Sequence, residues 1–428
     1  MGFLLGPMQE HLEGHKELTD QSAVRVCDPE KVYIALFQGR SEVKVLVNEN
    51  DYVKVGTKIA ERSDHFYVPM YASVSGKVLG IEKRFHSSRK KVDHLVIEND
   101  HKYELAEGLS TLDYTKATKE EIVSFIKEKG IVGCGGAGFP TYVKFNGVTD
   151  CKTLIINAVE CEPYITADYR TIFDNIELFT EGVKALFKTS GANICKIAVK
   201  VSHPDLIKRI NDSLDGADNM IVVGVPDVYP MGWERTLIMQ LEHKRYDRLP
   251  IEAGCIVDNA TTAVFLGLAM KNGSPIAMKY VTVSGDAVKE PANVKCPVGT
   301  PVSELVAACN GYAYDQVKLI SGGPMMGAAQ MNDEFTVAPQ TNAITVVQAI
   351  DVKASTCLRC GACVDHCPAG LQPVNIVNAE KTKNIDLLLK LNTKACIECG
   401  MCTYICPSNI EVTEGVRRAK RYLALQKK

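Results

Sequence analysis

The chain lacks any hydrophobic run long enough to cross a bilayer. Its longest apolar stretches, residues 263–270 and 343–350, are far shorter than the roughly 18 residues that a membrane span needs. It also lacks an excess of positive charge, because 49 Lys and Arg residues face 51 Asp and Glu residues. Nucleic acid is therefore not expected as a partner, since phosphate binding requires a basic surface. The first 16 residues have no basic region ahead of their short apolar run, so we expect no secretory signal there.

Histidine pairs with the spacing of metal ligands are also absent among the nine histidines. Cysteine is abundant, with 16 in a chain of 428 residues. Without a secretory signal, so many cysteines predict a reducing compartment, where they serve metals or redox chemistry rather than disulfides. Hydrophobic residues make up 46% and charged residues 23%, which is typical of a globular protein, and the length predicts three or four domains.

Half of the cysteines lie near the end of the chain in two copies of the pattern C-x2-C-x2-C-x3-C-P. This spacing is typical of [4Fe–4S] ferredoxins, in which the fourth cysteine of each run binds the other cluster. Structural zinc would use two separated pairs of ligands, whereas here three cysteines crowd into seven residues. The first cluster site is therefore predicted to be Cys357, Cys360, Cys363 and Cys406, and the second cluster site Cys396, Cys399, Cys402 and Cys367.

Several residues around these motifs have simpler interpretations. Gly361 and Gly400 stand where a side chain would crowd a cluster, and His366 is expected to be a solvent-facing loop residue. Residues 412–428 predict a basic amphipathic helix that either packs on the cluster domain or docks on a membrane or an acidic partner. The remaining isolated cysteines are expected to be small buried hydrophobic residues: Cys27, Cys151, Cys195, Cys255, Cys296 and Cys309.

A glycine-rich loop follows a predicted helix over residues 118–129. Gly133, Gly135 and Gly138 satisfy the pattern G-x-G-x-x-G. A dinucleotide-binding loop should follow a strand and open a helix, so the preceding helix argues against an ordinary Rossmann crossover. So many glycines still indicate that the backbone approaches another group closely.

Alternating strands and helices are predicted downstream of this loop. Residues 152–158 form a buried-strand pattern that ends in the acidic turn 159–163. Further strands are expected at 195–201 and 220–225, with a helix over 204–214 between them. Charged residues at the carboxyl end of a strand are where an α/β sheet places its ligand site, although these acids could also simply face water.

Four segments resemble a known family: GCGGAGFPTYVKF, LIINAVECEPYITADYR, VGVPDVYPMGWE and SGGPMMG, all ahead of the paired cysteine motifs. From about residue 24 onward, the sequence resembles the C subunit of the Rnf complex, a membrane-bound ferredoxin:NAD+ oxidoreductase coupled to ion translocation. Its core is similar to the flavin-containing NADH-oxidising subunit of respiratory complex I. The resemblance implies hydride exchange between NAD(H) and FMN, then single-electron transfer through two [4Fe–4S] clusters.

The resemblance also implies site residues by motif position, none of which acts as an acid, base or nucleophile. Those implied to hold FMN are Gly133, Gly135, Gly136, Lys144, Asn157, Glu160 and Asn259, and those implied to line the nicotinamide side are Phe139, Glu162, Tyr229, Gly232 and Glu234. The sequence departs from the family pattern at Cys134, Trp233 and Asp258. An aspartate beside a phosphate would repel it unless the charge is neutralised.

The expected fold is multidomain α/β. We predict an N-terminal β module resembling a lipoyl or biotinyl domain (1–110), a Rossmann-like α/β domain for FMN and NAD(H) (111–275), a β-grasp, SLBB-like module (276–345) and an α-helical domain of ferredoxin type with two [4Fe–4S] clusters (346–428). The N-terminal module has no lysine on the turn at 69–75 that would carry a cofactor, so we expect it to be structural or to serve in docking.

The implied partners are other Rnf subunits, including a ferredoxin-like iron–sulfur subunit, with ferredoxin reached indirectly. The implied location is peripheral, on the cytoplasmic face of the cell membrane. Two alternatives stay open from the sequence. One is a soluble reductase of the same superfamily that serves a corrinoid protein or a selenoprotein reductase, and the other is an iron–sulfur electron relay without flavin.

Overall fold

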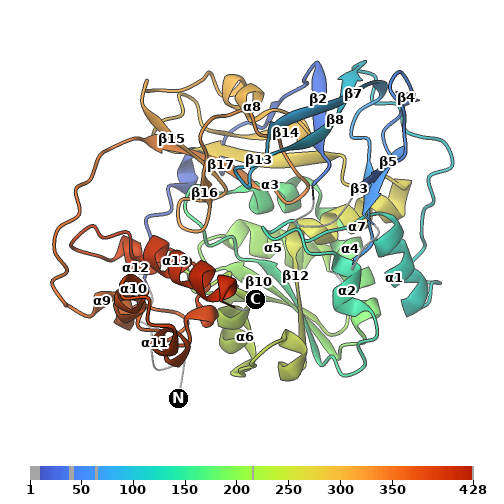
Figure 1. The fold of residues 1–428 in the computed structure, drawn as a ribbon. Helices are drawn as coiled ribbons and strands as arrows, with labels where there is room; N and C mark the ends of the chain where they lie inside the picture. The colour runs from blue at the N-terminus through green and yellow to red at the C-terminus, as the bar shows by residue number, and fades with distance from the viewer. Residues whose placement is uncertain (1–9, 38–42, 63–65, 215, 427–428) are drawn as a thin grey trace.

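The computed structural model describes residues 10–37, 43–62, 66–214 and 216–426. Within these ranges the chain forms four sheets followed by a group of short helices (Figure 1). No helix there combines the length and the apolar character that crossing a membrane would require. Single 3-10 turns lie at Lys16–Leu18, Pro250–Ala253 and Thr393–Ala395.

The N-terminal part is a β module of two antiparallel sheets. One sheet has the order β2 (Lys31–Ala35), β8 (Lys91–Asn99), β7 (Gly76–Phe85) and β4 (Tyr52–Val53), and the other the order β3 (Val43–Val45), β5 (Lys58–Arg62) and β6 (Val68–Tyr71). The turn after β6 packs inward, because the Ser73 hydroxyl donates to the Val298 carbonyl at 2.5 Å and the Tyr71 hydroxyl donates to the Glu128 carbonyl. This contact supports the structural interpretation of the module.

The central part is a parallel sheet with helices on both faces. Its strand order is β11 (Met220–Val225), β10 (Ile194–Lys200), β9 (Thr153–Ala158) and β12 (Cys255–Asn259). The helices are α1 (Lys119–Glu128), α2 (Thr141–Phe145), α3 (Ala167–Asp174), α4 (Ile176–Ser190), α5 (Pro204–Ser213), α6 (Glu234–Glu242) and α7 (Ala260–Asn272). Parallel strands are covered on both faces, which explains why β9 reads as an almost continuous apolar run. Its carboxyl end meets that of β12 at one edge of the sheet.

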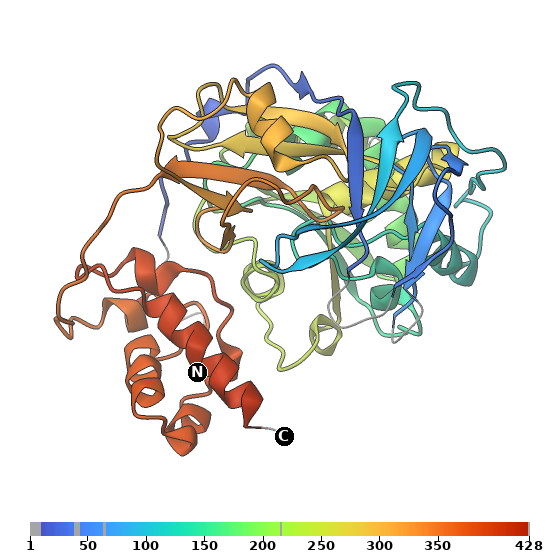
Figure 2. The same ribbon diagram turned by 45° about the horizontal axis from the view of Figure 1, so that its top comes forward.

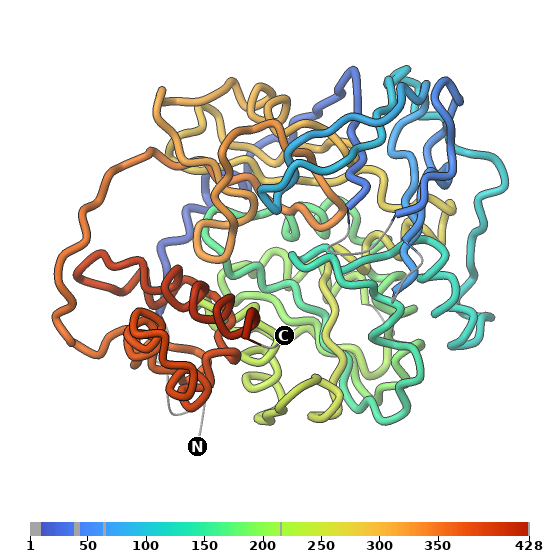
Figure 3. The backbone as a smooth tube through the Cα atoms, viewed as in Figure 1, coloured from blue at the N-terminus to red at the C-terminus, as the bar shows by residue number. Residues whose placement is uncertain are grey.

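A mixed sheet follows, with the order β1 (Arg25–Val26), β14 (Ala292–Pro297), β13 (Met278–Ser284), β17 (Ala343–Gln348), β15 (Val317–Ser321) and β16 (Ala328–Ala329). Helix α8 (Val302–Ala308) belongs to the same part. Strand β1 comes from the N-terminal end of the chain and pairs in parallel with β14. The N-terminal segment therefore passes from one part of the molecule to another (Figure 3).

The C-terminal helices form a separate body beside the parallel sheet (Figure 2). They are α9 (Ala362–Asp365), α10 (Pro373–Lys381), α11 (Ile385–Lys390), α12 (Met401–Tyr404) and α13 (Val412–Leu425). Residues 349–361 connect β17 to α9 as an extended segment at the edge of the molecule (Figure 1). Helix α13 buries Val416, Ala419 and Leu423 in the core of this body.

The basic residues of α13 are largely held by acids of the same body. Arg417 and Lys420 pair with Glu398 at 3.0 and 2.5 Å, and Arg418 lies 3.8 Å from Glu380. Helix α13 therefore packs on the cluster domain, which was one of the two interpretations of this segment.

The predicted elements of the central part agree with the structure to within about two residues. Helix α1 begins with the capping box of Thr118 and Glu121, and the glycine loop follows a helix rather than a strand. The six isolated cysteines are buried, as predicted: Cys27, Cys151, Cys195, Cys255, Cys296 and Cys309.

Helices α4 and α7 approach each other through two glycines. A Cβ added to Gly182 would stand 1.8 Å from the Ala263 carbonyl oxygen, and one added to Gly267 would stand 2.0 Å from the Leu178 carbonyl oxygen. Both clashes are with backbone, which cannot rotate away. Helices α4 and α7 can therefore pack this closely against each other only because both positions are glycine.

We predict that Gly182→Ala destabilises the protein, because the two helices must separate. The expected cost is about 2 kcal/mol or more, since overpacking in a close-packed core outweighs the gain in helix propensity. Thermal unfolding should show a melting temperature several degrees lower. Glu177→Ala, an exposed position of the same helix, should have a small effect, and equal melting temperatures for the two variants would contradict the prediction.

Candidate functional site

A cavity of about 410 Å³ lies at the carboxyl edge of the parallel sheet. Its walls come from the glycine loop, the turn after β9, the segment before α6 and the β12–α7 junction, with Met326 and Asn342 added from the mixed sheet. We call it the sheet-edge pocket. Eleven of the twelve residues implied by the resemblance line it: Gly133, Gly135, Gly136, Phe139, Lys144, Asn157, Glu160, Glu162, Gly232, Glu234 and Asn259.

Tyr229 is the exception. Its side chain is 2% exposed and is absent from the lining of the sheet-edge pocket. Its hydroxyl donates to the carbonyl oxygen of Cys399 at 2.7 Å. Tyr229 therefore contacts the second cluster site, and its role on the nicotinamide side stays a prediction.

The glycine loop leaves room for a ligand on the pocket side. Gly136 has a φ of 135°, and a Cβ there would meet no protein atom within 4 Å. A Cβ at Gly135 would stand 2.9 Å from the Asn259 amide nitrogen. The loop is anchored by the Cys134 N–H, which donates to the Thr262 hydroxyl at 3.0 Å, and the Cys134 thiol is fully buried away from the lining. The Cys134 side chain therefore does not line the sheet-edge pocket.

The N-terminus of α7 opens beside the loop. Asn259 caps this helix by accepting from the Thr262 N–H at 3.2 Å, and its amide donates to Asp168 at 2.8 Å. The Thr261 hydroxyl donates to the other Asp168 oxygen at 2.6 Å. A helix N-terminus beside glycine-rich backbone favours an anion, so this end of the sheet-edge pocket fits the phosphate of FMN.

Asp258 is neutralised by Lys144. The Lys144 ammonium lies 3.2 Å from Asp258 Oδ1 and also donates to the Val257 carbonyl at 2.9 Å. The Asp258 side chain is fully buried and Lys144 is about a quarter exposed. The negative charge of Asp258, which would repel a phosphate, is therefore balanced by the positive charge of Lys144.

The acids of the turn after β9 are occupied by backbone donors. The carboxylate of Glu160 accepts from the N–H of Asp168 at 2.8 Å, at the start of α3, and burial raises the pKa of Glu160. The carboxylate of Glu162 accepts from the N–H groups of Met325 and Met326 at 3.1 and 2.8 Å, and burial likewise raises its pKa to about 7. Both acids therefore shape the wall of the pocket.

Two further polar residues of the lining, Asn157 and Glu234, are also held in place. The Asn157 amide donates to the Gly232 carbonyl at 2.9 Å, and Glu234 accepts from the Tyr246 hydroxyl at 2.7 Å. Trp233, another departure from the family pattern, lies between Gly232 and Glu234 in the same wall.

The second cluster site is gathered around a small hollow. All four predicted thiols line it: Cys367, Cys396, Cys399 and Cys402. The fourth cysteine of the first run is thus brought to the first cysteine of the second run across 29 positions of sequence, as the crossed assignment requires. Backbone N–H groups face these sulfurs, with Glu398 donating to Cys396 and Leu371 to Cys367, both at 3.4 Å.

The predicted thiols of the first cluster site lie within electrostatic reach of one another. Burial raises the pKa of the Cys363 thiol, and Cys360, Cys357 and Cys406 raise it further. The assignment of Cys406 to the first run stays a prediction. Among the described residues no group of three or more His, Cys, Asp or Glu side chains is placed to hold a single metal ion.

His366 corrects another expectation. Its ring is 7% exposed rather than solvent-facing. One nitrogen lies 2.7 Å from Glu10 Oε1 and the other lies 2.9 Å from the Ala362 carbonyl. The residue between two cluster ligands therefore connects the cluster body to the N-terminal segment.

The second cluster site adjoins the sheet-edge pocket through the loop 321–327. Gly400, in the second cysteine run, packs so closely that a Cβ would stand 2.5 Å from the Met325 carbonyl oxygen. The N–H groups of Met325 and Met326 donate hydrogen bonds to Glu162. Cys161 and Met325 also pack against Tyr229, Cys399 and Met401. The pocket and the second cluster site thus share a wall.

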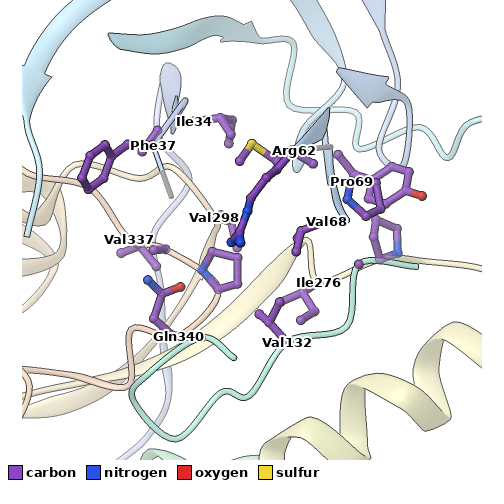
Figure 4. A pocket seen from close by; sticks show the side chains of 18 of the residues that line it. Ile34, Phe37, Arg62, Val68, Pro69, Val132, Ile276, Val298, Val337 and Gln340 are labelled. Carbon is purple, nitrogen blue, oxygen red and sulfur yellow. The ribbon is translucent and has the colours of Figure 1, made fainter. Parts of the chain in front are cut away.

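A second cavity, of about 380 Å³, lies on the other side of the glycine loop (Figure 4). Its walls are largely apolar and come from three parts of the chain, for example Ile34, Ile276 and Val337. None of the twelve implied cofactor residues lines it. The predicted chemistry therefore belongs to the sheet-edge pocket.

Four domain families match the chain in sequence. They are described as the RnfC barrel sandwich hybrid domain (residues 10–102), the Nuo51 FMN-binding domain (126–266), the SLBB domain (280–329) and the 4Fe-4S dicluster domain (349–407). The C subunit of the proton-translocating ferredoxin:NAD(+) oxidoreductase complex of Clostridium ljungdahlii is 34% identical over 85% of this chain and 81% of its own length. This chain belongs to the family of Rnf complex C subunits. The resemblance, the fold class and the cofactors, FMN and two [4Fe–4S] clusters, are confirmed, whereas the exact domain borders stay predictions.

Other relatives agree. The C subunit of the Na(+)-translocating ferredoxin:NAD(+) oxidoreductase complex of Acetobacterium woodii is 34% identical over 77% of this chain and 76% of its own length. The C subunit of the ion-translocating oxidoreductase complex of Rhodobacter capsulatus is 33% identical over 86% and 73%, respectively. Among solved structures, an NAD+-reducing [NiFe]-hydrogenase in the H2-reduced state has a TM-score of 0.50 at 18% identity, covering 73% of this chain and 62% of that one. The last likeness concerns the fold alone.

The pairing of Lys144 with Asp258 makes a testable prediction for stability. Lys144→Met should leave a buried carboxylate without its partner and cost about 3 kcal/mol, because an uncompensated buried charge is strongly destabilising. The double variant Lys144→Met with Asp258→Asn should recover much of this loss in urea unfolding. Equal unfolding midpoints for the single and double variants would contradict the prediction.

Proposed function

We propose that this member of the Rnf family exchanges a hydride between NAD(H) and FMN in the sheet-edge pocket and passes single electrons through its two cluster sites to or from a partner subunit of a ferredoxin:NAD+ oxidoreductase complex. One observation carries the proposal. Eleven implied cofactor residues gather in one pocket, and the wall of that pocket is shared with four cysteines of predicted cluster spacing.

The residues that would hold FMN divide by chemistry. The N-terminus of α7, with Asn259 and the glycine loop, would bind the phosphate, and Lys144 adds a positive charge that is shared with Asp258. Glu162, Phe139, Gly232 and Glu234 would line the nicotinamide side. Bound FMN supplies the conversion between the two electrons of a hydride and the single electrons that [4Fe–4S] clusters carry. The protein residues position these groups and exclude water.

The two cluster sites hold different positions along the proposed route. The second cluster site contacts the wall of the sheet-edge pocket through Gly400, which packs on the loop 321–327 that Glu162 holds, so we place it next to the flavin. The first cluster site includes Cys357 and Cys360, which lie on an exposed segment at the edge of the molecule (Figure 1). Electrons would therefore reach or leave the partner at the first cluster site.

The partner that we propose is a ferredoxin-like iron–sulfur subunit of the complex, with ferredoxin itself reached indirectly. The protein would be held peripherally on the cytoplasmic face of the membrane. The matches to members of such complexes support membership of an assembly of this kind.

The direct test is anaerobic purification with reconstituted iron and sulfide, followed by absorbance spectra before and after stoichiometric NADH. Bleaching of both the flavin band and the broad cluster absorbance is expected. If the clusters are intact, nothing bleaches and acid extraction releases no FMN, the NADH dehydrogenase assignment fails and the flavin-free relay replaces it.

The shared wall makes a kinetic prediction. Gly400→Ala should displace the loop 321–327, because its Cβ would stand 2.5 Å from the Met325 carbonyl oxygen. With iron content unchanged, stopped-flow absorbance should show flavin reduction by NADH at the wild-type rate and cluster reduction several-fold slower.

Gly361→Ala is the matched control for this variant. Gly361 has the equivalent place in the first cysteine run and a similar φ, 83° against 80° for Gly400, but the nearest atom to its added Cβ is 3.8 Å away. Backbone strain is therefore common to both variants, and only the close approach differs. Equal slowing of cluster reduction in both would sink the proposed contact.

A further inference from the structure

The two halves of the cluster body differ at two equivalent positions. One residue after the third cysteine of each run stands Val364 in the first half and Thr403 in the second. Seven residues after the fourth cysteine stand Val374 in the first half and Thr413 in the second. Both changes replace a β-branched apolar side chain by one of the same shape that carries a hydroxyl.

The two threonines form a directed chain of hydrogen bonds. The Thr413 N–H, in the first turn of α13, donates to the Thr403 hydroxyl oxygen at 2.9 Å, and the Thr403 hydroxyl donates to the Thr413 hydroxyl oxygen at 2.9 Å. The hydrogen of the Thr413 hydroxyl is then left for Cys402, whose sulfur lies 3.2 Å away. A cysteine that binds iron does so as a thiolate and has no hydrogen to donate. Thr413 is therefore the donor.

The first half makes a different contact. Val364 offers no acceptor for the N–H of residue 374, and that N–H instead faces the Cys363 sulfur, where it favours the thiolate by lowering its pKa. At these positions the third cysteine thus faces a backbone amide in the first half and a side-chain hydroxyl in the second. Thr413 and Cys402 are both buried, with 5% and 9% exposure, so water cannot easily replace the hydroxyl.

We propose that Thr413 sets the reduction potential of the second cluster by donating its hydroxyl hydrogen to Cys402 Sγ. A hydrogen bond to a ligand sulfur stabilises the additional negative charge of the reduced cluster and so raises its potential. The inference rests on the proposed ligand assignment and deepens it. The second cluster site, next to the pocket, thus has a side-chain hydroxyl donor at the position where the first half has Val374.

Potentiometric titration followed by EPR tests the proposal on the full chain loaded with both clusters. Thr413→Val keeps the shape of the side chain and removes the donor. The midpoint of one cluster should shift to a more negative potential, while the other, an internal control in the same molecule, stays at its wild-type value. Thr413→Ser, which keeps the hydroxyl, should leave both midpoints near wild type. If Thr413→Val fails to take up iron, Thr413→Ala serves the same comparison.

A double variant separates the hydroxyl from a general packing effect. In Thr403→Val with Thr413→Val, the N–H of residue 413 loses its acceptor and becomes free to face Cys402, as the N–H of residue 374 faces Cys363. The midpoint should return part of the way toward wild type. Unchanged midpoints in Thr413→Val, or equal shifts of both clusters, would overturn the proposal. A wild-type protein with fewer than two clusters would instead refute the ligand assignment itself.

Discussion

The carboxylate of Glu162 holds the loop 321–327 against the sheet-edge pocket, and the arrangement of the redox sites depends on this contact. Both oxygens are used, by the N–H groups of Met325 and Met326. The approach is so close that a Cβ on Gly323 would stand 2.3 Å from one of the oxygens. Because the opposite side of this loop packs on Gly400, one loop fixes the separation between the pocket and the second cluster site. A hydrogen bond donated to a carboxylate contributes more than one donated to a neutral acceptor, and two such bonds on one loop also fix its orientation.

Acidic side chains line the pocket that is expected to bind the anionic phosphate of FMN, and their charges would repel it. Hydrogen-bond and ion-pair partners of these acids reduce this repulsion. Four of the acids are Glu160, Glu162, Asp168 and Asp258. Backbone N–H groups satisfy the first two, Asn259 and Thr261 satisfy the third, and Lys144 pairs with one oxygen of the fourth. Burial also raises the pKa of Glu160 and of Glu162. The acids therefore order the walls, and the helix N-terminus of α7 is left to attract the ligand.

Local patterns predicted what depends on local sequence. The capping box of α1, the strand periodicity of β9 and the cysteine spacing each involve residues within one element or one motif, and the structure has them as expected. His366 was misplaced because its partner, Glu10, lies 356 positions away, and the bond of Tyr229 to Cys399, 170 positions away, was not predicted for the same reason. Asp168 was missed for the same reason, since its bonds to Asn259 and Thr261 join the start of α3 to the start of α7. A local motif predicts the backbone position of a residue but not which distant group its side chain contacts.

Residues 349–360, which connect the cluster body to β17, are exposed and form no helix or strand. The N-terminal segment provides additional contacts that hold the cluster body in place. Leu12 packs with Tyr229, Cys399 and Met401, and Glu10 bonds to His366. Burying a Leu or Met side chain contributes about 2 kcal/mol, whereas the Tyr229 hydrogen bond contributes about 1 kcal/mol. Apolar packing therefore dominates this interface, and the hydrogen bonds set its register. The segment continues to Lys16, which donates to the Glu160 carbonyl at 2.9 Å. The same stretch of chain thus holds both the cluster body and the acidic turn of the pocket, so neither can move without straining the other.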